Sequence, residues 1–504
     1  MRALLTLPLF LLLTGICCAM MLVPAVLALS LEAFHDARAF FYSAVLGLIL
    51  TGFFGLAVGG RPHNRNSMSQ LRALLGAFVV LPVFLAVPFF EAVRTTTFLN
   101  AYFEMVSALT TTGATLFDPQ RLTEAQHLWR AQVGWMGGLL IWVASAAILA
   151  PLALGGFEVT SLAEPGQGPT GSAAADRTDP ARRVLRATQV LAPVYVVLTL
   201  ILWLLLMICG DTPFVAISHA MSTMATSGIS PVGGIQNGTA GIAGEMVIFC
   251  FMFFALSRLT FSGDTAGAAR TGLRTDPEFR MGLIIVIGVP VLLFLRHWVA
   301  AFEVGDKENI WAGIRSLWGG MFTVLSFLST TGFESVDWVD VRLWSGLETP
   351  GMILMGLALI GGGVATTAGG VKLMRVYALY LNGAREIERL IHPSSVGHAS
   401  EALRRIRREG AFIAWVFFML VAMTIAGVTT ILGLLDVEFT RSVLLAVASL
   451  CNTGPLITAA AETPIDLIAQ TAPVKAVLMA AMILGRLEML AIVVMLTPDA
   501  WRDA

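Results

Sequence analysis

The chain has 504 residues, of which 57% are hydrophobic and only 13% are charged. Because soluble domains carry about 25% charged residues, this composition excludes a soluble protein and indicates an integral membrane protein. The net charge of −1 and the five cysteines, which show no paired spacing, indicate neither a nucleic-acid partner nor a disulfide framework nor a thiolate metal site.

Ten apolar segments are long enough to cross a hydrocarbon core as helices. They lie at about 4–29, 40–58, 73–92, 129–154, 187–209, 242–261, 281–300, 350–382, 411–435 and 474–497. The first is expected to be a retained helix rather than a secretory signal, because it is too long and lacks a clear cleavage site.

Four shorter apolar pieces, near 98–109, 213–225, 311–328 and 440–450, lie between the members of the last four pairs of spans. They are mostly too short to span and are expected to be re-entrant half-helices. Each runs into a short polar motif that ends in glycine. The motifs are Thr111-Thr112-Gly113, Thr226-Ser227-Gly228, Thr330-Thr331-Gly332 and Asn452-Thr453-Gly454.

The motif glycines lie 115, 104 and 122 residues apart, which predicts a fourfold internal repeat of helix, pore helix with loop, and helix. The expected fold is an all-α membrane protein with ten transmembrane helices and four pseudo-symmetric repeats around a central pore. Residues 1–60 would form two extra helices. The four repeats would be residues 61–155, 156–262, 263–384 and 385–504. The alternative is that the motifs are ordinary helix caps, which four matching occurrences make the weaker interpretation.

Arginines gather in the loops that follow the second, fourth, sixth and eighth spans. The positive-inside rule therefore places these loops and both termini in the cytoplasm, with the glycine motifs opening outward. Residues 155–181, rich in Gly, Pro, Ser and Ala, are expected to be a flexible connection. Six acids near the third motif would concentrate cations at the outer face, and the alternative is that they are ordinary solvated loop acids. They are Glu303, Asp306, Glu308, Glu334, Asp337 and Asp340.

Backbone carbonyls arranged around an axis can replace the water shell of a cation without any net charge. Glycine suits such a loop because it tolerates positive φ and has no side chain to fill the pore. The four motifs are therefore the predicted ion-binding residues, and their hydroxyl groups would add ligands or brace the loops.

The eighth span is expected to be a broken helix. It holds five glycines within ten residues, namely Gly361, Gly362, Gly363, Gly369 and Gly370, with Thr366 and Thr367 between them. Each glycine would cost a continuous helix about 1 kcal/mol relative to alanine. A mobile segment beneath the motif loops would form a gate, and the alternative is close packing of small residues between helices.

Arg486 lies about halfway along the tenth span. A charge there costs about 2.5 to 3.5 kcal/mol on insertion scales, so it should face a cavity or a partner. We expect it to face the pore as a barrier to cations, with a salt bridge to an acid of another repeat as the alternative. Lys372 and Arg375 are expected to snorkel at the inner interface.

These motifs, together with the run from Gly361 to Lys372 and the sequence Gly485-Arg486-Leu487-Glu488, resemble the Trk/Ktr/HKT superfamily of cation transporters, and most closely its TrkH branch. The resemblance covers the whole chain. It implies that glycine in all four loops goes with potassium preference, whereas serine in the first loop goes with sodium in some plant relatives. It also implies a gating role for the eighth-span loop, a cytosolic TrkA-like nucleotide-binding regulatory subunit, and a homodimer.

The expected function is passive potassium uptake across the bacterial inner membrane, with potassium as substrate, lipids around the chain, no bound cofactor and no enzymatic activity. No nucleotide-hydrolysis motif is present. The alternatives are a sodium- or proton-coupled potassium symporter, a less selective monovalent cation transporter, or an intramembrane enzyme. An enzyme would need a nucleophile and base within the spans, where Ser and His occur only scattered.

Overall fold

The computed structural model describes residues 8–58, 67–152, 154–157, 180–257, 276–301, 310–346, 349–392 and 410–496. Over these ranges the chain is helical and has no β-strand, which confirms the all-α fold. Most of the predicted cytoplasmic arginine loops and most of the 155–181 connection lie outside the described residues.

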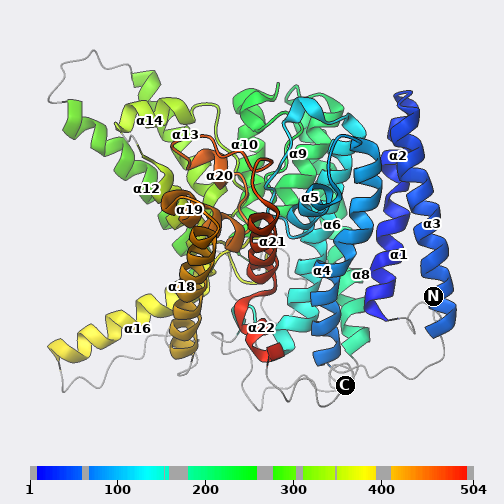
Figure 1. Ribbon diagram of the computed structural model, residues 1–504. Coiled ribbons are helices and arrows are strands. Elements are labelled where there is room, and N and C mark those ends of the chain that lie inside the picture. The colour runs from blue at the N-terminus through cyan, green and yellow to red at the C-terminus, as the bar shows by residue number, and fades with distance from the viewer. Residues whose placement is uncertain are drawn as a thin grey trace.

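The N-terminal helices pack beside the first repeat (Figure 1). They are α1 (Leu9–Met20), α2 (Leu22–Ser30) and α3 (Phe34–Val58). The predicted first span is thus two helices, and Pro24 explains the interruption because it cannot donate a hydrogen bond to the carbonyl of Met20. Asp36 of α3 accepts hydrogen bonds from Thr123 Oγ1 (2.6 Å) and Gln126 Nε2 (3.1 Å). These bonds fasten the extra helices to the start of the last helix of repeat 1.

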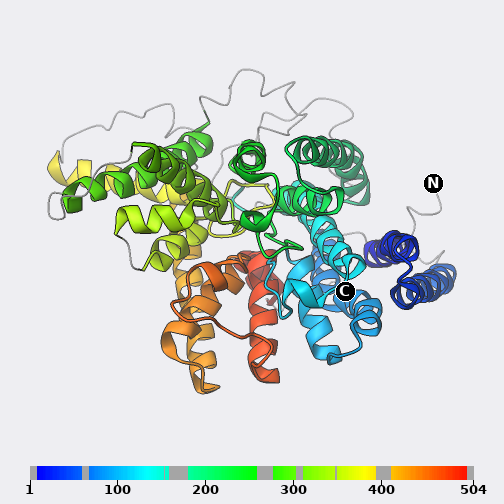
Figure 2. The same cartoon turned by 90° about the horizontal axis from the view of Figure 1, so that it is seen from above.

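Four units of three helices follow, and we number them in chain order. Unit 1 is α4 (Ser67–Val93), α5 (Phe98–Leu109) and α6 (Glu124–Ala144); unit 2 is α8 (Pro180–Ile208), α9 (Pro213–Ala225) and α10 (Gly241–Met252); unit 3 is α12 (Pro277–Ala301), α13 (Ile310–Leu328) and α15 (Gly351–Ile360); unit 4 is α18 (Gly410–Leu434), α19 (Phe439–Leu450) and α21 (Ala472–Leu487). Seen from above, the four units surround a common centre (Figure 2).

Several short pieces and one longer helix, α16, complete the described chain. They are η2 (Pro119–Arg121), η3 (Ser145–Leu149), η4 (Ala150–Leu152), η7 (Ile235–Asn237), η8 (Phe253–Ala255), α14 (Trp338–Ser345), α16 (Leu373–Ile391), α20 (Leu456–Ala459) and α22 (Met489–Leu496). Helix α16 projects sideways from the bundle at the end opposite α14 (Figure 1). The residue boundaries predicted for the repeats stay a prediction, and the one at 384 falls inside α16.

The four pieces predicted to be pore helices are α5, α9, α13 and α19, each within one residue of its expected bounds. Local sequence explains where they begin. Thr97 caps α5 by accepting a hydrogen bond from the amide of Asn100, and Pro213 occupies the first turn of α9, where its missing N–H costs nothing. Helix α6, which follows the first pore helix, begins with a capping box formed by Thr123 and Gln126.

Within the described residues, seven helical stretches are long and apolar enough to cross a membrane, with α1 and α2 together counted as one. They correspond to the predicted first to fifth, seventh and ninth spans. The sixth is shorter than expected, because α10 turns into η8 and ends by Ala255. The tenth is broken at Glu488, whose φ of +65° interrupts the helix between α21 and α22. The eighth is broken, as predicted, by a non-helical segment from Gly361 to Lys372.

Candidate functional site

The four pore helices end in the same way. The first residue of each motif is left-handed, with φ of +55° at Thr111, +51° at Thr226, +58° at Thr330 and +53° at Asn452. The amide of the next residue donates to the carbonyl five positions earlier. These bonds run from Thr112 to Ser107 (2.8 Å), from Ser227 to Ser222 (3.0 Å), from Thr331 to Ser326 (2.9 Å) and from Thr453 to Ala448 (2.9 Å). Each end is thus a helix cap of the Schellman type, and we call the motifs loops 1 to 4.

The loops meet one another in cyclic order. A Cβ atom added at Gly113 would lie 1.8 Å from the carbonyl oxygen of Ser227 in loop 2. One at Gly228 would lie 2.3 Å from that of Thr331 in loop 3, and one at Gly332 would lie 2.9 Å from Cβ of Pro455, directly after loop 4. Pro455 also reaches across the ring, because its Cγ would lie 2.5 Å from a Cβ atom at Gly228. The ring closes because the amide of Gly454 donates to the carbonyl of Thr112 at 2.5 Å. Four simple caps would not do this, so the ring separates the motifs from ordinary helix ends.

The side chains at the second motif position brace their own loops. Thr112, Ser227 and Thr331 pair with hydroxyls of their own pore helix ends at 2.8, 3.1 and 2.9 Å. Thr453 donates to the carbonyl of Cys451 at 3.3 Å. Of the two roles predicted for these hydroxyls, bracing is the one that these hydrogen bonds fit.

A second row of contacts lies behind the loops. Glu104 of α5 forms an ion pair with Arg130 (2.6 Å) and accepts a hydrogen bond from the amide of Leu116 (3.0 Å). In unit 2, His219 shares a hydrogen bond with Ser230 (2.9 Å). In unit 3, Thr323 accepts from the amide of Ser335 at 3.3 Å.

The 361–372 segment lies directly against the ring from below. The amide of Gly369 donates to Thr330 Oγ1 of loop 3 at 2.7 Å, and a Cβ atom at Gly369 would lie 2.1 Å from the carbonyl oxygen of Cys451, beside loop 4. Thr367 Oγ1 donates to the carbonyl of Met224 in α9 at 3.3 Å. The segment therefore touches the ends of three pore helices.

The segment is held at its flanks by backbone bonds. The amide of Gly363 donates to the carbonyl of Ala255 at 2.9 Å, and the amide of Leu373 donates to the carbonyl of Gly362 at 2.9 Å. Added Cβ atoms at Gly361 and Gly370 would lie 2.2 Å from the carbonyl oxygen of Gly369 and 2.6 Å from that of Ala358, respectively. The alternative to a gate was close packing of small residues between helices. Small residues are packed closely here, but within a non-helical loop and not between two helices.

Arg486, near the end of α21, reaches this segment. Its side chain is buried, and Nη1 donates to the carbonyl of Thr367 at 2.8 Å. Within the described residues no acid lies in ion-pair distance of its guanidinium, and its Nε and Nη2 atoms make no hydrogen bond. The salt bridge considered for Arg486 is therefore not found in the part of the chain that the structure describes.

The family model of TrkH, described as a cation transport protein, matches residues 63–501. The chain belongs to the TrkH family.

Among curated relatives, it is 31% identical over 472 residues to the Trk system potassium uptake protein TrkH of Salmonella typhimurium, covering 90% of this chain and 92% of that protein. It is 29% identical over 471 residues to the TrkH of Escherichia coli K12, with the same coverage. The crystal structure of the potassium transporter TrkH from Vibrio parahaemolyticus matches with a TM-score of 0.78 at 26% identity and covers the whole of both chains.

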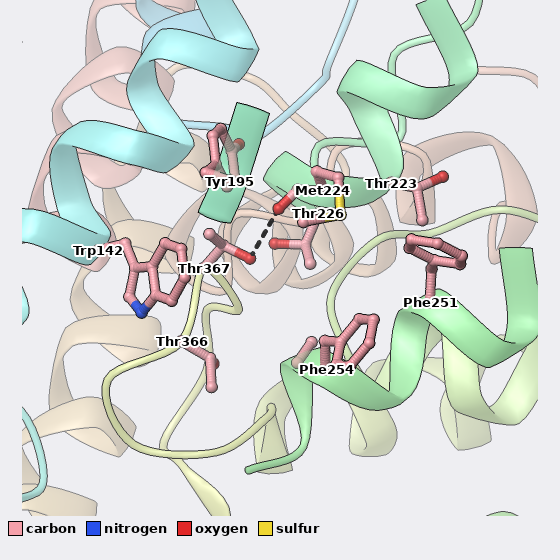
Figure 3. Close-up of a pocket in the computed structure, with 10 residues that line it drawn as sticks. Trp142, Tyr195, Thr223, Met224, Thr226, Phe251, Phe254, Thr366 and Thr367 are labelled. Atoms are coloured by element: carbon pink, nitrogen blue, oxygen red, sulfur yellow. Dashed lines mark hydrogen bonds between the residues drawn. The ribbon is translucent and has the colours of Figure 1, made fainter. Parts of the chain in front are cut away.

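A small cavity lies between loop 2 and the segment of this TrkH-family chain (Figure 3). Thr226, Thr366 and Thr367 contribute hydroxyl groups, and Trp142 and Tyr195 contribute aromatic walls. Its volume is about 20 Å³, which is room for about one water-sized particle.

Two basic residues expected at the inner interface are instead buried beneath the ring. Lys372 is 7% exposed and Arg375 is fully buried. Arg375 pairs with Glu488 at 2.7 Å, and its guanidinium lies 3.6 Å from the ring centroid of Phe417, whereas Lys372 Nζ donates to the carbonyl of Ala368. The prediction of snorkelling side chains is therefore wrong, because Arg375 finds an acid and an aromatic face inside the protein and Lys372 finds a backbone carbonyl.

Three of the acids near loop 3 differ in their surroundings, while Glu303, Asp306 and Glu308 lie outside the described residues. Asp337 is buried and accepts a hydrogen bond from Arg315 Nε at 3.1 Å, so its charge is compensated. Asp340 is exposed and also lies within 4.0 Å of Arg315. Burial raises the pKa of Glu334 above its usual range, while Arg342 opposes this shift. Of these three acids, only Glu334 stands next to loop 3 without an ion pair in the described part of the chain.

Proposed function

We propose that this chain takes up potassium through a channel-like pore whose selectivity filter is the ring of loops 1 to 4. The observation that carries the proposal is the closed ring, in which four matched helix ends touch in cyclic order. Carbonyls held at fixed places around an axis can replace the hydration shell of a cation. The carbonyl of Thr112 accepts the Gly454 amide but has a second lone pair, so it can still contribute to such a site.

Potassium preference is supported by the names of the relatives and by glycine at the third position of every loop. The chain offers no residues for ATP hydrolysis, so the driving force would be the membrane potential, worth about 2.3 kcal/mol per charge per 100 mV. A coupled symporter for sodium or protons remains the second candidate, and a less selective monovalent cation transporter is the third.

We propose that the 361–372 segment is the gate. It touches three pore-helix ends from the inner side, and Thr367 at its centre is held by two hydrogen bonds, to the carbonyl of Met224 and from Arg486. Thr366 bonds to the carbonyl of Gly363 within the segment at 2.7 Å. Arg486 would act with it in two ways, by holding Thr367 in the closed position and by placing a positive charge beneath the filter.

The remaining elements of the proposal rest on the family resemblance and on arginine placement. A cytosolic TrkA-like nucleotide-binding subunit would act on the cytoplasmic side, and two copies of the chain would associate. The protein would lie in the bacterial inner membrane with both termini in the cytoplasm. A pull-down from membranes with tagged protein tests the regulatory partner.

The transport proposal is tested by rubidium uptake into proteoliposomes under an imposed potential, with sodium as competitor. The wild-type protein should accumulate rubidium without an added proton or sodium gradient, and excess sodium should have little effect. Uptake that requires a sodium or proton gradient would establish the symporter, and equal transport of sodium and rubidium would establish the unselective transporter.

A further inference from the structure

The residue nine positions before each motif glycine occupies the same place behind the ring. These residues are Glu104, His219, Thr323 and Leu445. In units 1, 2 and 3 this side chain bonds to the stretch two or three residues beyond the glycine, at Leu116, Ser230 and Ser335. In unit 4 it is an apolar side chain that cannot form such a bond.

Arg130, the ion-pair partner of Glu104, also has a counterpart in unit 4. Gly137 and Gly485 are equivalent, because an added Cβ atom on each would lie 2.0 Å from the carbonyl oxygen of the last residue of its pore helix, Leu109 or Leu450. Seven positions before them stand Arg130 in unit 1 and Leu478 in unit 4. Unit 1 therefore carries a buried ion pair where unit 4 carries two buried leucines.

Loop 4 has another support, a side-chain amide that also joins it to loop 1. Asn452 Nδ2 donates to Thr112 Oγ1 (3.0 Å) and to the carbonyl of Met482 (2.9 Å). The counterpart of Asn452 in loop 1 is Thr111, whose hydroxyl makes no hydrogen bond within the described residues. The stretch after Gly113 is held by Glu104 and by Ser107, whose Oγ donates to the carbonyl of Ala114 at 2.7 Å.

We infer that the buried Glu104–Arg130 ion pair is a positioning brace that fixes loop 1 and thereby sets how strongly the filter discriminates potassium from sodium. This inference rests on the proposed function of the ring. Both side chains are almost fully buried, at 1% and 4% exposure, so the pair is little screened by solvent and holds the carboxylate in one orientation. The carboxylate in turn fixes the amide of Leu116, three residues after Gly113.

The ion pair with Arg130 distinguishes loop 1 from loop 3. A hydrogen bond to a carboxylate is about twice as strong as one between neutral groups. Unit 3 also has such bonds, because Glu245 of α10 accepts from Ser335 Oγ (2.9 Å) and from the Val336 amide (2.5 Å), but Glu245 forms no ion pair within the described residues. In unit 2, His219 lies 3.7 Å from Asp211. A loop that loses its brace can draw its carbonyls inward around the smaller sodium ion. Loss of the pair should therefore reduce discrimination more than it reduces potassium conduction.

The test uses the full-length protein in proteoliposomes and measures rubidium uptake with and without competing sodium. Glu104→Gln keeps the shape of the side chain and removes its charge. The double variant Glu104→Leu/Arg130→Leu reproduces the pair found in unit 4 and leaves no unpaired charge. Glu438→Gln is the matched control, because Glu438 forms an exposed ion pair with Arg441 (3.3 Å) at the start of pore helix α19.

The expected result is that the rubidium-over-sodium preference falls about fivefold in the double variant, in the range of effects of residues that do not touch the ligand. It should fall less in Glu104→Gln, which can still accept the Leu116 amide, and should stay unchanged in Glu438→Gln. If Glu104→Gln fails to fold because Arg130 is stranded, the double variant alone decides.

A double variant that transports rubidium with wild-type preference would overturn the inference. A double variant that folds, as judged by its melting temperature, but transports nothing would also overturn it, because the pair would then serve conduction and not discrimination. If the wild-type protein itself shows no rubidium preference, the proposed filter function fails before the brace is tested.

Discussion

Replacing Arg486 by methionine is the perturbation for which the structure makes the sharpest prediction. Methionine keeps an unbranched chain of similar reach but removes the charge. The variant loses the hydrogen bond from Nη1 to the carbonyl of Thr367 at 2.8 Å. A hydrogen bond to a charged group contributes about 1.5 to 3 kcal/mol, and 1.4 kcal/mol corresponds to a factor of ten. If this bond holds the 361–372 segment closed, potassium flux should rise by about tenfold or more.

Stability should move in the opposite sense to that expected for a broken salt bridge. Because no acid pairs with Arg486 in the described part of the chain, Arg486→Met strands no charge, and the melting temperature should stay constant or rise. Arg375→Met is the contrasting control. It leaves Glu488 without its 2.7 Å partner, at a cost of about 3 to 5 kcal/mol, so its melting temperature should fall. Rubidium flux in proteoliposomes and melting in detergent are measured on both variants, and an Arg486→Met protein that melts clearly lower without gaining flux would refute the gate role of Arg486.

Three further predictions follow from single positions. Gly113→Ser should let sodium compete for rubidium uptake, because Gly113 has φ of +74° and a Cβ atom there would lie 1.8 Å from the Ser227 carbonyl oxygen; unchanged competition with intact flux would place loop 1 outside the filter. Gly369→Ala should raise basal flux without a regulator. Its Cβ atom would lie 2.1 Å from the Cys451 carbonyl oxygen and would push the 361–372 segment away from loop 4. Normal flux from a folded variant would contradict this. Because burial raises the pKa of Glu334, its contribution to stability is present below the ordinary pKa of about 4.3 and is lost as pH rises through the folded value. Glu334→Gln should therefore raise the melting temperature at pH 8 and leave it unchanged near pH 4, and equal shifts at both would refute the assignment.

Much of the architecture could be predicted from the sequence because its signals are local or periodic. The pore helices were placed by short apolar stretches that end at glycine, and the structure confirms them as α5, α9, α13 and α19. The broken eighth span followed from the helix cost of five glycines. The breaks at Pro24 and Glu488 were missed. The first carries a local signal, a proline inside an apolar run, whereas the second is a left-handed residue whose side chain pairs with Arg375.

The contacts behind and beneath the ring were less predictable because they join residues far apart in the chain. Arg375 and Glu488 are 113 positions apart, and no local sequence pattern links them. The sequence did hold one unused signal, since polar residues stand nine positions before three of the four motif glycines. Superposing the repeats in the sequence would have found Glu104, His219 and Thr323 as a set. That the ring closes, and in which order, required the three-dimensional contacts.

The reversal potential of the purified wild-type protein in a bilayer with potassium on one side and sodium on the other tests the central claim most directly. The account predicts a current through an open pore that reverses at a strongly potassium-selective voltage and does not shift when a proton gradient is imposed. The Gly113→Ser variant should move the reversal toward zero. A wild-type reversal near zero, or one that follows the proton gradient, would contradict a passive potassium filter built from the four loops.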